Sequence, residues 1–185
     1  MKDITNEEKG YAKINLALHV TGIQADGYHS LDSIVVFTDV FDRLFFQRSL
    51  KNVVTLTGEF SGSINVQENS ILQALKLFGN GLTDRFSINL EKNLPIGAGL
   101  GGGSADAAAV IRFITNNSKN LMPSYEVLSK IGADIPACVL SIASRVGGIG
   151  EIVRPLDISE INLWVVLVNP DIFVSTGSIL SLIHI

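Results

Sequence analysis

The stretch that decides the fold is NLPIGAGLGGGSAD, residues 93–106. Five of the seven residues from Gly97 to Gly103 are glycine. Without Cβ atoms, successive backbone N–H groups can point into one concavity, and the unpaired N–H groups at a helix N-terminus add to the attraction for anions. Because a strand pattern precedes this stretch and a helix pattern follows it, we predict a phosphate-binding loop in preference to a flexible surface loop or a close helix–strand contact.

The segments on either side of this loop carry strand patterns. Ala12–Val20 predicts a half-buried strand, because its even-numbered positions are apolar and polar residues alternate with them. The continuous apolar run at 163–168 predicts a buried strand. Runs rich in β-branched and aromatic residues predict further strands at 33–47, 53–57, 63–66, 86–90 and 152–154.

Helical patterns are grouped in the middle of the chain. Apolar residues at helical spacing predict one helix after Asn69 and another over 104–116, directly after the loop. The second helix would have Ser104 as its N-cap and Asp106 in its first turn. Because strands cluster before helices, the order predicts an α+β fold and not a regularly alternating doubly wound fold. Shorter helices are predicted at 123–130 and 133–140.

Composition excludes several classes of protein. The chain has 185 residues, 46% of them apolar, and a formal net charge of −4 with its Lys and Arg scattered, so we expect neither a nucleic-acid partner nor a membrane. No apolar run approaches the ~18 residues that span a bilayer, and no apolar signal core opens the chain, so we expect a cytoplasmic protein. Composition leaves the oligomeric state open. The single Cys138 excludes a disulfide framework and is assigned to packing, and the three histidines do not form a metal-ligand spacing.

Common phosphate-binding motifs do not account for the loop. Gly97, Gly99 and Gly102 satisfy G-x-G-x-x-G, but a dinucleotide-binding fold needs a second strand ending in an acidic residue about 20 residues further on. The segment TNNSKNLMPSYEV (115–127) occupies that place and has no strand pattern. A Walker A loop needs Gly-Lys-Ser/Thr, and a protein kinase needs V-A-I-K, H-R-D and D-F-G segments; the sequence has none of these.

The same residues resemble another family. LPIGAGLGGGSADAA (94–108) resembles the central glycine-rich motif of the GHMP small-molecule kinases. Within that family, YAKINLALHVTGIQADGYHSLDSI (11–34) and IGADIPACV (131–139) are similar to the signatures of the kinases that act on a cytidine-diphosphate-linked methylerythritol. GIGE (148–151) and VNPDIFVSTGSI (168–179) match in pattern and order. The resemblance therefore covers most of residues 11–179.

The resemblance implies an ATP-dependent enzyme. It would transfer the γ-phosphoryl group, with Mg²⁺ neutralising the phosphates, to the 2-hydroxyl of 4-(cytidine 5′-diphospho)-2-C-methyl-D-erythritol in the non-mevalonate route to isoprenoid precursors. By analogy with the family, Asp134 would accept the hydroxyl proton and Lys13 would stabilise charge beside it. Asn15 and Thr176 would meet the substrate, with Tyr28 stacked on the cytosine and His29 at its edge. The nucleotide would be held by Pro95, Gly97, Ala98, Gly99, Leu100, Gly101, Gly102, Gly103 and Ser104.

Each of these residues also has a plainer interpretation. Lys13 could be a solvated residue on a strand face, and Asp134 could be a helix cap. The functional interpretation is favoured by the occurrence of all these residues in the family's order around one loop. The other four could be ordinary turn or strand residues: Tyr28 and His29 at a core edge, Asn15 as a satisfied polar group and Thr176 as a structural residue.

The resemblance also implies a domain division. Family members continue well beyond the V-S-T segment, so we expect residues 1–168 to form an ATP-binding N-terminal domain and residues 169–185 to be the truncated start of an α/β C-terminal domain. The final LSLIHI (180–185) does not resemble the family and is expected to be non-native. Two other functions stay open: a sibling kinase of homoserine or mevalonate type, and an inactive nucleotide-binding fragment.

Overall fold

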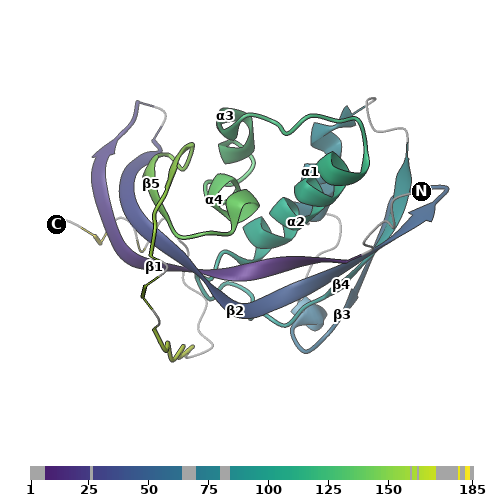
Figure 1. Cartoon of the computed structure of the whole chain (residues 1–185), viewed down its shortest axis with the longest axis horizontal. Helices are drawn as coiled ribbons and strands as arrows, with labels where there is room; N and C mark the ends of the chain where they lie inside the picture. Colours follow the sequence, from purple (N-terminus) through teal and green to yellow (C-terminus); the bar gives the residue numbers. More distant parts are fainter. Residues whose placement is uncertain are drawn as a thin grey trace.

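A six-stranded sheet forms the base of the molecule (Figure 1). The structure is a computed structural model that describes residues 7–25, 27–63, 70–79, 84–158, 160–161, 163–169, 179 and 182–183. The chain begins with two long antiparallel strands, β1 (Glu7–Ile23) and β2 (His29–Ser49). The other strands are short: β3 (Val53–Thr57), β4 (Arg85–Glu91), β5 (Ser144–Gly148) and β6 (Ile152–Pro155).

Strand β2 organises the sheet because it is paired on both of its edges. One edge pairs with β1 from His29 to Phe45. The other edge pairs with β5 over Leu31–Val35 and with β4 over Arg43–Ser49, again antiparallel. Strand β3 then adds parallel to β4, and β6 adds antiparallel to β5. The residues of β2 are rich in Val, Ile and Phe, which suit a strand packed on one face and paired on both sides.

The helices cover one face of this sheet (Figure 1). They are α1 (Ser70–Leu77), α2 (Gly102–Asn117), α3 (Tyr125–Ser129) and α4 (Ile135–Leu140). A short 3₁₀ helix at Ser61–Ser63 follows β3 and is not part of this layer (Figure 1). A mixed, mainly antiparallel sheet with its helices grouped on one side confirms the predicted α+β class. No helix among the residues described is long and apolar enough to cross a membrane.

Helix α2 lies at the centre of the core. Its small alanines, such as Ala105 and Ala107, are buried and let the helix approach the sheet closely. Further along, Phe113 stacks on Phe46 of β2 with ring centroids 3.8 Å apart and meets Phe86 of β4 edge-on at 5.2 Å. This packing fixes α2 against β2 and β4, so the helix presents its N-terminus at a defined place on the sheet.

Several predicted elements differ from the observed ones. The run at 163–168 forms no strand, and its side chains are exposed, up to 97% at Trp164; no described strand pairs with this run or covers it. Strand β5 was not predicted, because Ser144–Gly148 has neither an alternating pattern nor a run of large apolar residues. At 63–66, Ser63 lies in the 3₁₀ helix and the rest falls outside the described residues.

The burial predicted for β1 is wrong at two positions. Lys13, expected on the polar face, is only 3% exposed, whereas Leu16, expected inside, is 49% exposed. The register with β2 shifts between Asn15 and Ala17, so Leu16 is the extra residue of a bulge. A bulge bends the strand and changes the direction of its side chains, which a period-two pattern does not anticipate.

Candidate active site

The glycine loop joins β4 to α2, as predicted. Gly97, Gly99 and Gly101 have φ angles of 71°, 73° and 66°, a left-handed conformation that residues with a Cβ rarely adopt. Gly102 packs closely, because a Cβ there would lie 3.0 Å from Lys92 Nζ and the ammonium would have to shift. A backbone that alternates left-handed glycines with other conformations directs its N–H groups into an anion-binding concavity. The geometry of the loop therefore suits phosphate.

The start of α2 differs from the prediction. Gly101, not Ser104, is the N-cap, since the helix already begins at Gly102. Ser104 lies inside the first turn, where its Oγ is 3.2 Å from the position of a Cβ on Gly132. The hydroxyl therefore faces the segment that leads to Asp134 and does not cap the helix. Of the remaining predicted loop residues, Pro95, Ala98 and Leu100 lie between β4 and α2, and Gly103 is the second residue of α2.

Lys13 and Asp134 meet beside the end of the loop. Lys13 Nζ lies 3.3 Å from Asp134 Oδ1, with the lysine side chain 4% exposed and the aspartate 42% exposed. Asp134 does occupy the N-cap position of α4, but its carboxylate makes no capping hydrogen bond. The interpretations as a solvated lysine and an ordinary helix cap are both wrong, because the lysine is buried and the carboxylate is directed to it.

Gly101 brings the loop and this ion pair together. A Cβ on Gly101 would lie 3.3 Å from Lys13 Cε and 3.6 Å from Asp134 Oδ2. The backbone N–H of Lys13 donates to the carbonyl of Leu100 at 2.8 Å, which fastens β1 to the loop. A cation, a carboxylate and the N-terminus of a 16-residue helix therefore converge at one point.

A chain of hydrogen bonds orients Asn15. Lys13 Nζ donates to Asn15 Oδ1 at 2.5 Å, and Asn15 Nδ2 donates to Ser33 Oγ at 2.7 Å. The Ser33 hydroxyl in turn donates to the carbonyl of Ala17 at 2.7 Å. Because Ser33 is buried, it holds the amide of Asn15 in one orientation, with its oxygen toward the lysine. Sequence reasoning missed Ser33, which lies 18 residues from Asn15, although it stands within the quoted segment 11–34.

Tyr28 and His29 lie at the far end of the β1–β2 hairpin. His29 pairs with Ile23, ten residues along β1 from Lys13, which is roughly 33 Å for a straight strand. The register shifts in β1 bend this path, and in Figure 1 the hairpin end curves toward the helix side of the sheet. Tyr28 is 52% exposed and does not plug a core edge. Thr176 lies outside the described residues.

A second charged cluster lies beneath the loop and was not predicted. Lys92 Nζ donates to Asp42 Oδ2 and, at 3.1 Å, to Asp106 Oδ2, and all three residues are buried. Asp106 does not lie in the first turn, where we expected it, because α2 already begins at Gly102. Burial raises the pKa of Asp106 to about 7, against the lowering effect of Lys92, and the charge of Asp42 raises it further. The positions 42 and 92 are 50 residues apart, so no local pattern could have found this cluster.

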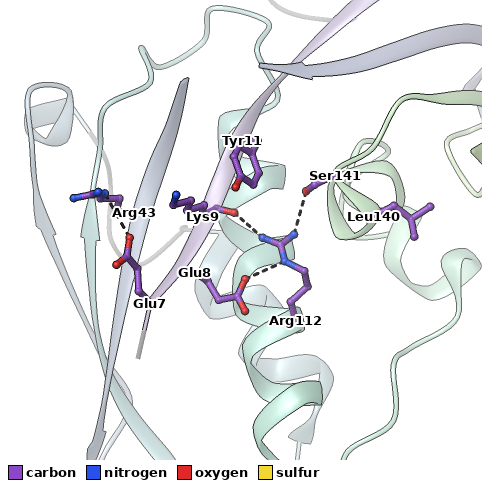
Figure 2. A pocket seen from close by; sticks show the side chains of 8 residues that line it. All are labelled: Glu7, Glu8, Lys9, Tyr11, Arg43, Arg112, Leu140 and Ser141. Carbon is purple, nitrogen blue, oxygen red and sulfur yellow. Dashed lines mark hydrogen bonds and ion pairs between the residues drawn. The ribbon is translucent and has the colours of Figure 1, made fainter. Parts of the chain in front are cut away.

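A concavity of about 800 Å³ lies elsewhere, around Arg112 (Figure 2). The guanidinium donates to Glu8 Oε2 at 3.1 Å, to the carbonyls of Lys9 and Cys138 at 2.6 and 2.7 Å, and to Ser141 Oγ at 3.3 Å. Its nitrogens are thus engaged in joining β1, α2 and α4, which is a structural role. Cys138 is buried, as expected for packing, and burial raises the pKa of its thiol. None of the predicted site residues lines this concavity.

Comparison with known proteins agrees with the geometry. Residues 69–148 match the family described as GHMP kinases N terminal domain. Curated relatives named 4-diphosphocytidyl-2-C-methyl-D-erythritol kinase include one from Cereibacter sphaeroides, 41% identical over 166 residues, and one from Rhizobium johnstonii, 42% identical over 181 residues. The alignments cover 89% and 93% of this chain and 59% of each relative, so the chain spans about three fifths of their length.

Solved structures give the same result for the fold. A crystal structure of 4-(cytidine 5′-diphospho)-2C-methyl-D-erythritol kinase superposes with a TM-score of 0.63 at 31% identity, covering 81% of this chain and 55% of that one. A mevalonate diphosphate decarboxylase from Legionella pneumophila, 13% identical, shares the fold with a TM-score of 0.53 over 82% of this chain and 53% of its own. The glycine loop, the sheet and these matches together show that the chain has the fold of the GHMP kinase N-terminal domain, whose family model matches residues 69–148.

Proposed function

We propose that this chain supplies the ATP-binding and catalytic part of a kinase that phosphorylates the 2-hydroxyl of 4-(cytidine 5′-diphospho)-2-C-methyl-D-erythritol. The observation that carries the proposal is the ion pair between Lys13 Nζ and Asp134 Oδ1, 3.3 Å apart and beside the last left-handed glycine of the loop. The choice of acceptor is supported by the names of relatives about 40% identical. The enzyme would act in isoprenoid precursor synthesis.

The loop fits the phosphates of ATP. Its left-handed glycines and the N-terminus of α2 supply backbone N–H donors and the positive end of a helix dipole. When bound, ATP supplies the γ-phosphoryl group, and Mg²⁺ neutralises part of its charge. Asp42 and Asp106 are buried against Lys92 and are not available to Mg²⁺, so we expect the nucleotide phosphates to hold the ion.

Lys13 and Asp134 would act on the acceptor. The partly exposed carboxylate of Asp134 would accept the proton of the acceptor hydroxyl. The hydroxyl oxygen of the acceptor would then form a bond to the γ-phosphorus, and ADP would leave. The buried ammonium of Lys13 would stabilise the negative charge on the transferred group, and little solvent screens it there. Asn15, oriented by Ser33, would bind the hydroxyl-bearing end of the acceptor.

The cytidine would lie at the other end of the hairpin. Tyr28 offers an exposed aromatic face and the neighbouring His29 a ring that both donates and accepts. The long path between these residues and Lys13 suits an acceptor whose reactive hydroxyl is separated from its base by a diphosphate. The role of Thr176 stays a prediction.

Phosphoryl transfer from γ-labelled ATP tests this proposal. We expect transfer to the cytidine substrate and not to homoserine or mevalonate, and a rate at least 100-fold lower for Asp134→Asn. The matched control is Asp84→Asn, because Asp84 also pairs with a cation, Arg48, at 3.4 Å and is similarly exposed. A rate for Asp134→Asn within tenfold of the unaltered chain would refute the role of Asp134. ADP binding without any transfer would favour the inactive nucleotide-binding fragment.

A further inference from the structure

We propose that Asp42, Lys92 and Asp106 position the glycine loop, and that Lys92 is a positioning residue and not a ligand of the nucleotide phosphates. This inference rests on the proposed function, because it concerns the loop that would bind ATP. It assigns a role to three buried residues that neither the motif nor the catalytic pair explains.

Lys92 is the residue from which a phosphate contact would ordinarily be expected. It directly precedes the loop, and a lysine near a glycine-rich loop commonly reaches phosphate. Here its side chain is 4% exposed, and its ammonium is engaged by Asp42 Oδ2 and by Asp106 Oδ2. Because both carboxyl groups engage the ammonium beneath the loop, its charge acts there and not on a ligand above the loop.

Asp42 fastens the beginning of the loop to β2. Its second oxygen, Oδ1, accepts from the backbone N–H of Asn93 at 2.6 Å and from that of Leu94 at 2.8 Å. Charge-assisted bonds to two consecutive amides fix the direction in which the chain leaves β4. The first two residues of the loop therefore have a defined position before any ligand binds.

Asp106 and Gly102 fasten the other end. Asp106 belongs to the second turn of α2 and is connected through Lys92 to the same Asp42. A Cβ on Gly102 would lie 3.0 Å from Lys92 Nζ and 3.8 Å from Asp42 Oδ2, so the helix start packs directly on the cluster and a side chain there would displace the ammonium. Both ends of the loop are consequently attached to one residue of the central strand.

This attachment bears directly on binding. Glycine loses more conformational freedom on ordering than any other residue, so an untethered loop with this many glycines would lose much of its phosphate affinity to entropy. Holding both ends in place removes part of that cost before the nucleotide arrives. Loss of the cluster should therefore weaken nucleotide binding and leave the distant cytidine end unaffected.

Calorimetric titration with Mg-ADP and, separately, with CDP tests the inference. For Lys92→Met we expect ADP to bind at least tenfold more weakly and CDP to bind within twofold of the unaltered chain. Asp106→Ala is a second variant that keeps the pair of Lys92 with Asp42, in case Lys92→Met does not fold. For this variant too we expect weaker binding of ADP and unchanged binding of CDP. Asp84→Asn, at the opposite end of β4, is the control and should change neither affinity.

Two results would overturn the inference: unchanged ADP affinity in a folded variant, or equal losses for ADP and CDP. If the unaltered chain binds no ADP, the proposed function fails, and amide hydrogen exchange then tests the positioning separately. Without any ligand, amides 93–101 should exchange at least tenfold faster in the cluster variant than in Asp84→Asn. Equal exchange rates would refute the positioning role whether or not the chain binds nucleotides.

Discussion

At the scale of single residues, Gly150 shows how the carboxylate at the candidate site is held in place. It has φ 116°, and a Cβ there would lie 2.0 Å from the carbonyl oxygen of Ala133, the residue before Asp134. The turn between β5 and β6 thus packs backbone against backbone on the segment that carries the aspartate. Neither the conformation nor the space admits a side chain at this position.

Gly150→Ala should therefore disturb both stability and chemistry. We expect the free energy of unfolding to fall by roughly 2 kcal/mol or more, because a strained backbone and a steric clash combine. Urea denaturation measures this, and the phosphoryl-transfer rate should fall as Asp134 moves. The control is Gly62→Ala, where nothing lies within 4 Å of the added Cβ. Similar stability of the two variants would contradict the close packing at Gly150.

Asp106 gives the molecule a predicted dependence on pH. Burial raises its pKa from 3.8 to about 7, so between these values the folded chain holds a proton that the unfolded chain releases. The free energy of unfolding contributed by this group should therefore fall as the pH rises from about 4 to about 7 and level off above. Asp106→Asn should abolish this part of the slope in urea titrations at several pH values.

Asp32 provides a control, because its contribution to the free energy of unfolding changes with pH in the opposite direction. A hydrogen bond from Arg145 lowers its pKa below 3.8, so its contribution to stability is present above that value and is lost as the pH falls further. Asp32→Asn should accordingly change the titration only in the acid range. A slope between pH 4 and 7 that persists in Asp106→Asn would show that another group is responsible.

The sequence located some of these residues and not others, for a physical reason. Lys13 and Asp134 lie in recognisable segments, and the structure brings them to 3.3 Å. Asp42 and Lys92 carry no such signal, because a buried ion pair looks like two ordinary charged residues until the fold places them together. Ser33 stands in a recognisable segment but was missed, because its bonds to Asn15 and Ala17 form only when β1 pairs with β2. Their contacts depend on strand register, which local spacing does not encode.

At the scale of elements, the close contact between β1 and α2 depends on Gly10, which has no side chain. A Cβ on Gly10 would lie 2.9 Å from Asp106 Oδ1 and 3.1 Å from the carbonyl carbon of Ala105. No hydrogen-bond partner for that oxygen lies among the residues described, so the strand backbone passes directly over a buried carboxylate. The distance between strand and helix is therefore set by Gly10.

Two glycines of the same strand make a matched test of this contact. Gly10→Ala should lower the melting temperature by several degrees, because the helix must move away from the strand. Gly22→Ala places its Cβ in open space and should be neutral or slightly stabilising. Thermal unfolding followed by circular dichroism measures both variants. Equal shifts would mean that β1 and α2 are not closely packed at Gly10.

Most elements could be predicted because their patterns are local. The helix after the loop, α1 and the strands β3 and β4 follow from periodicity and glycine stops. The exposure of Leu16 could not, since it depends on a bulge. Strand β5 could not either, because it is placed by its pairing with β2 and β6 and by the packing of Val146 against Val35 and Ala137. The predicted division at residue 168 stays a prediction.

At the scale of the whole molecule, the run at 163–168 is a contiguous stretch of exposed apolar side chains. Trp164 is 97% exposed, and Val166 and Val168 are nearly as open. Large apolar side chains gathered in water favour association with other surfaces. The net charge of −4 opposes such association only weakly once salt screens it.

The single tryptophan of the chain makes this exposure measurable. We expect the fluorescence of Trp164 to be quenched by iodide as efficiently as that of free tryptophan. Val166→Lys should raise the concentration at which the chain begins to associate in light scattering, whereas Lys51→Arg, a conservative change on an exposed turn, should not. Protected fluorescence in a monomeric sample would show that this run is covered.

The hydrogen bond from the Lys13 amide to the Leu100 carbonyl has a further consequence. It joins a strand at the start of the chain to a loop almost ninety residues later, so the two cannot move independently without breaking it. The resonance of this one amide is therefore a natural spectroscopic probe. Its chemical shift and solvent exchange should report whether the loop is occupied, with no label attached and no reaction required.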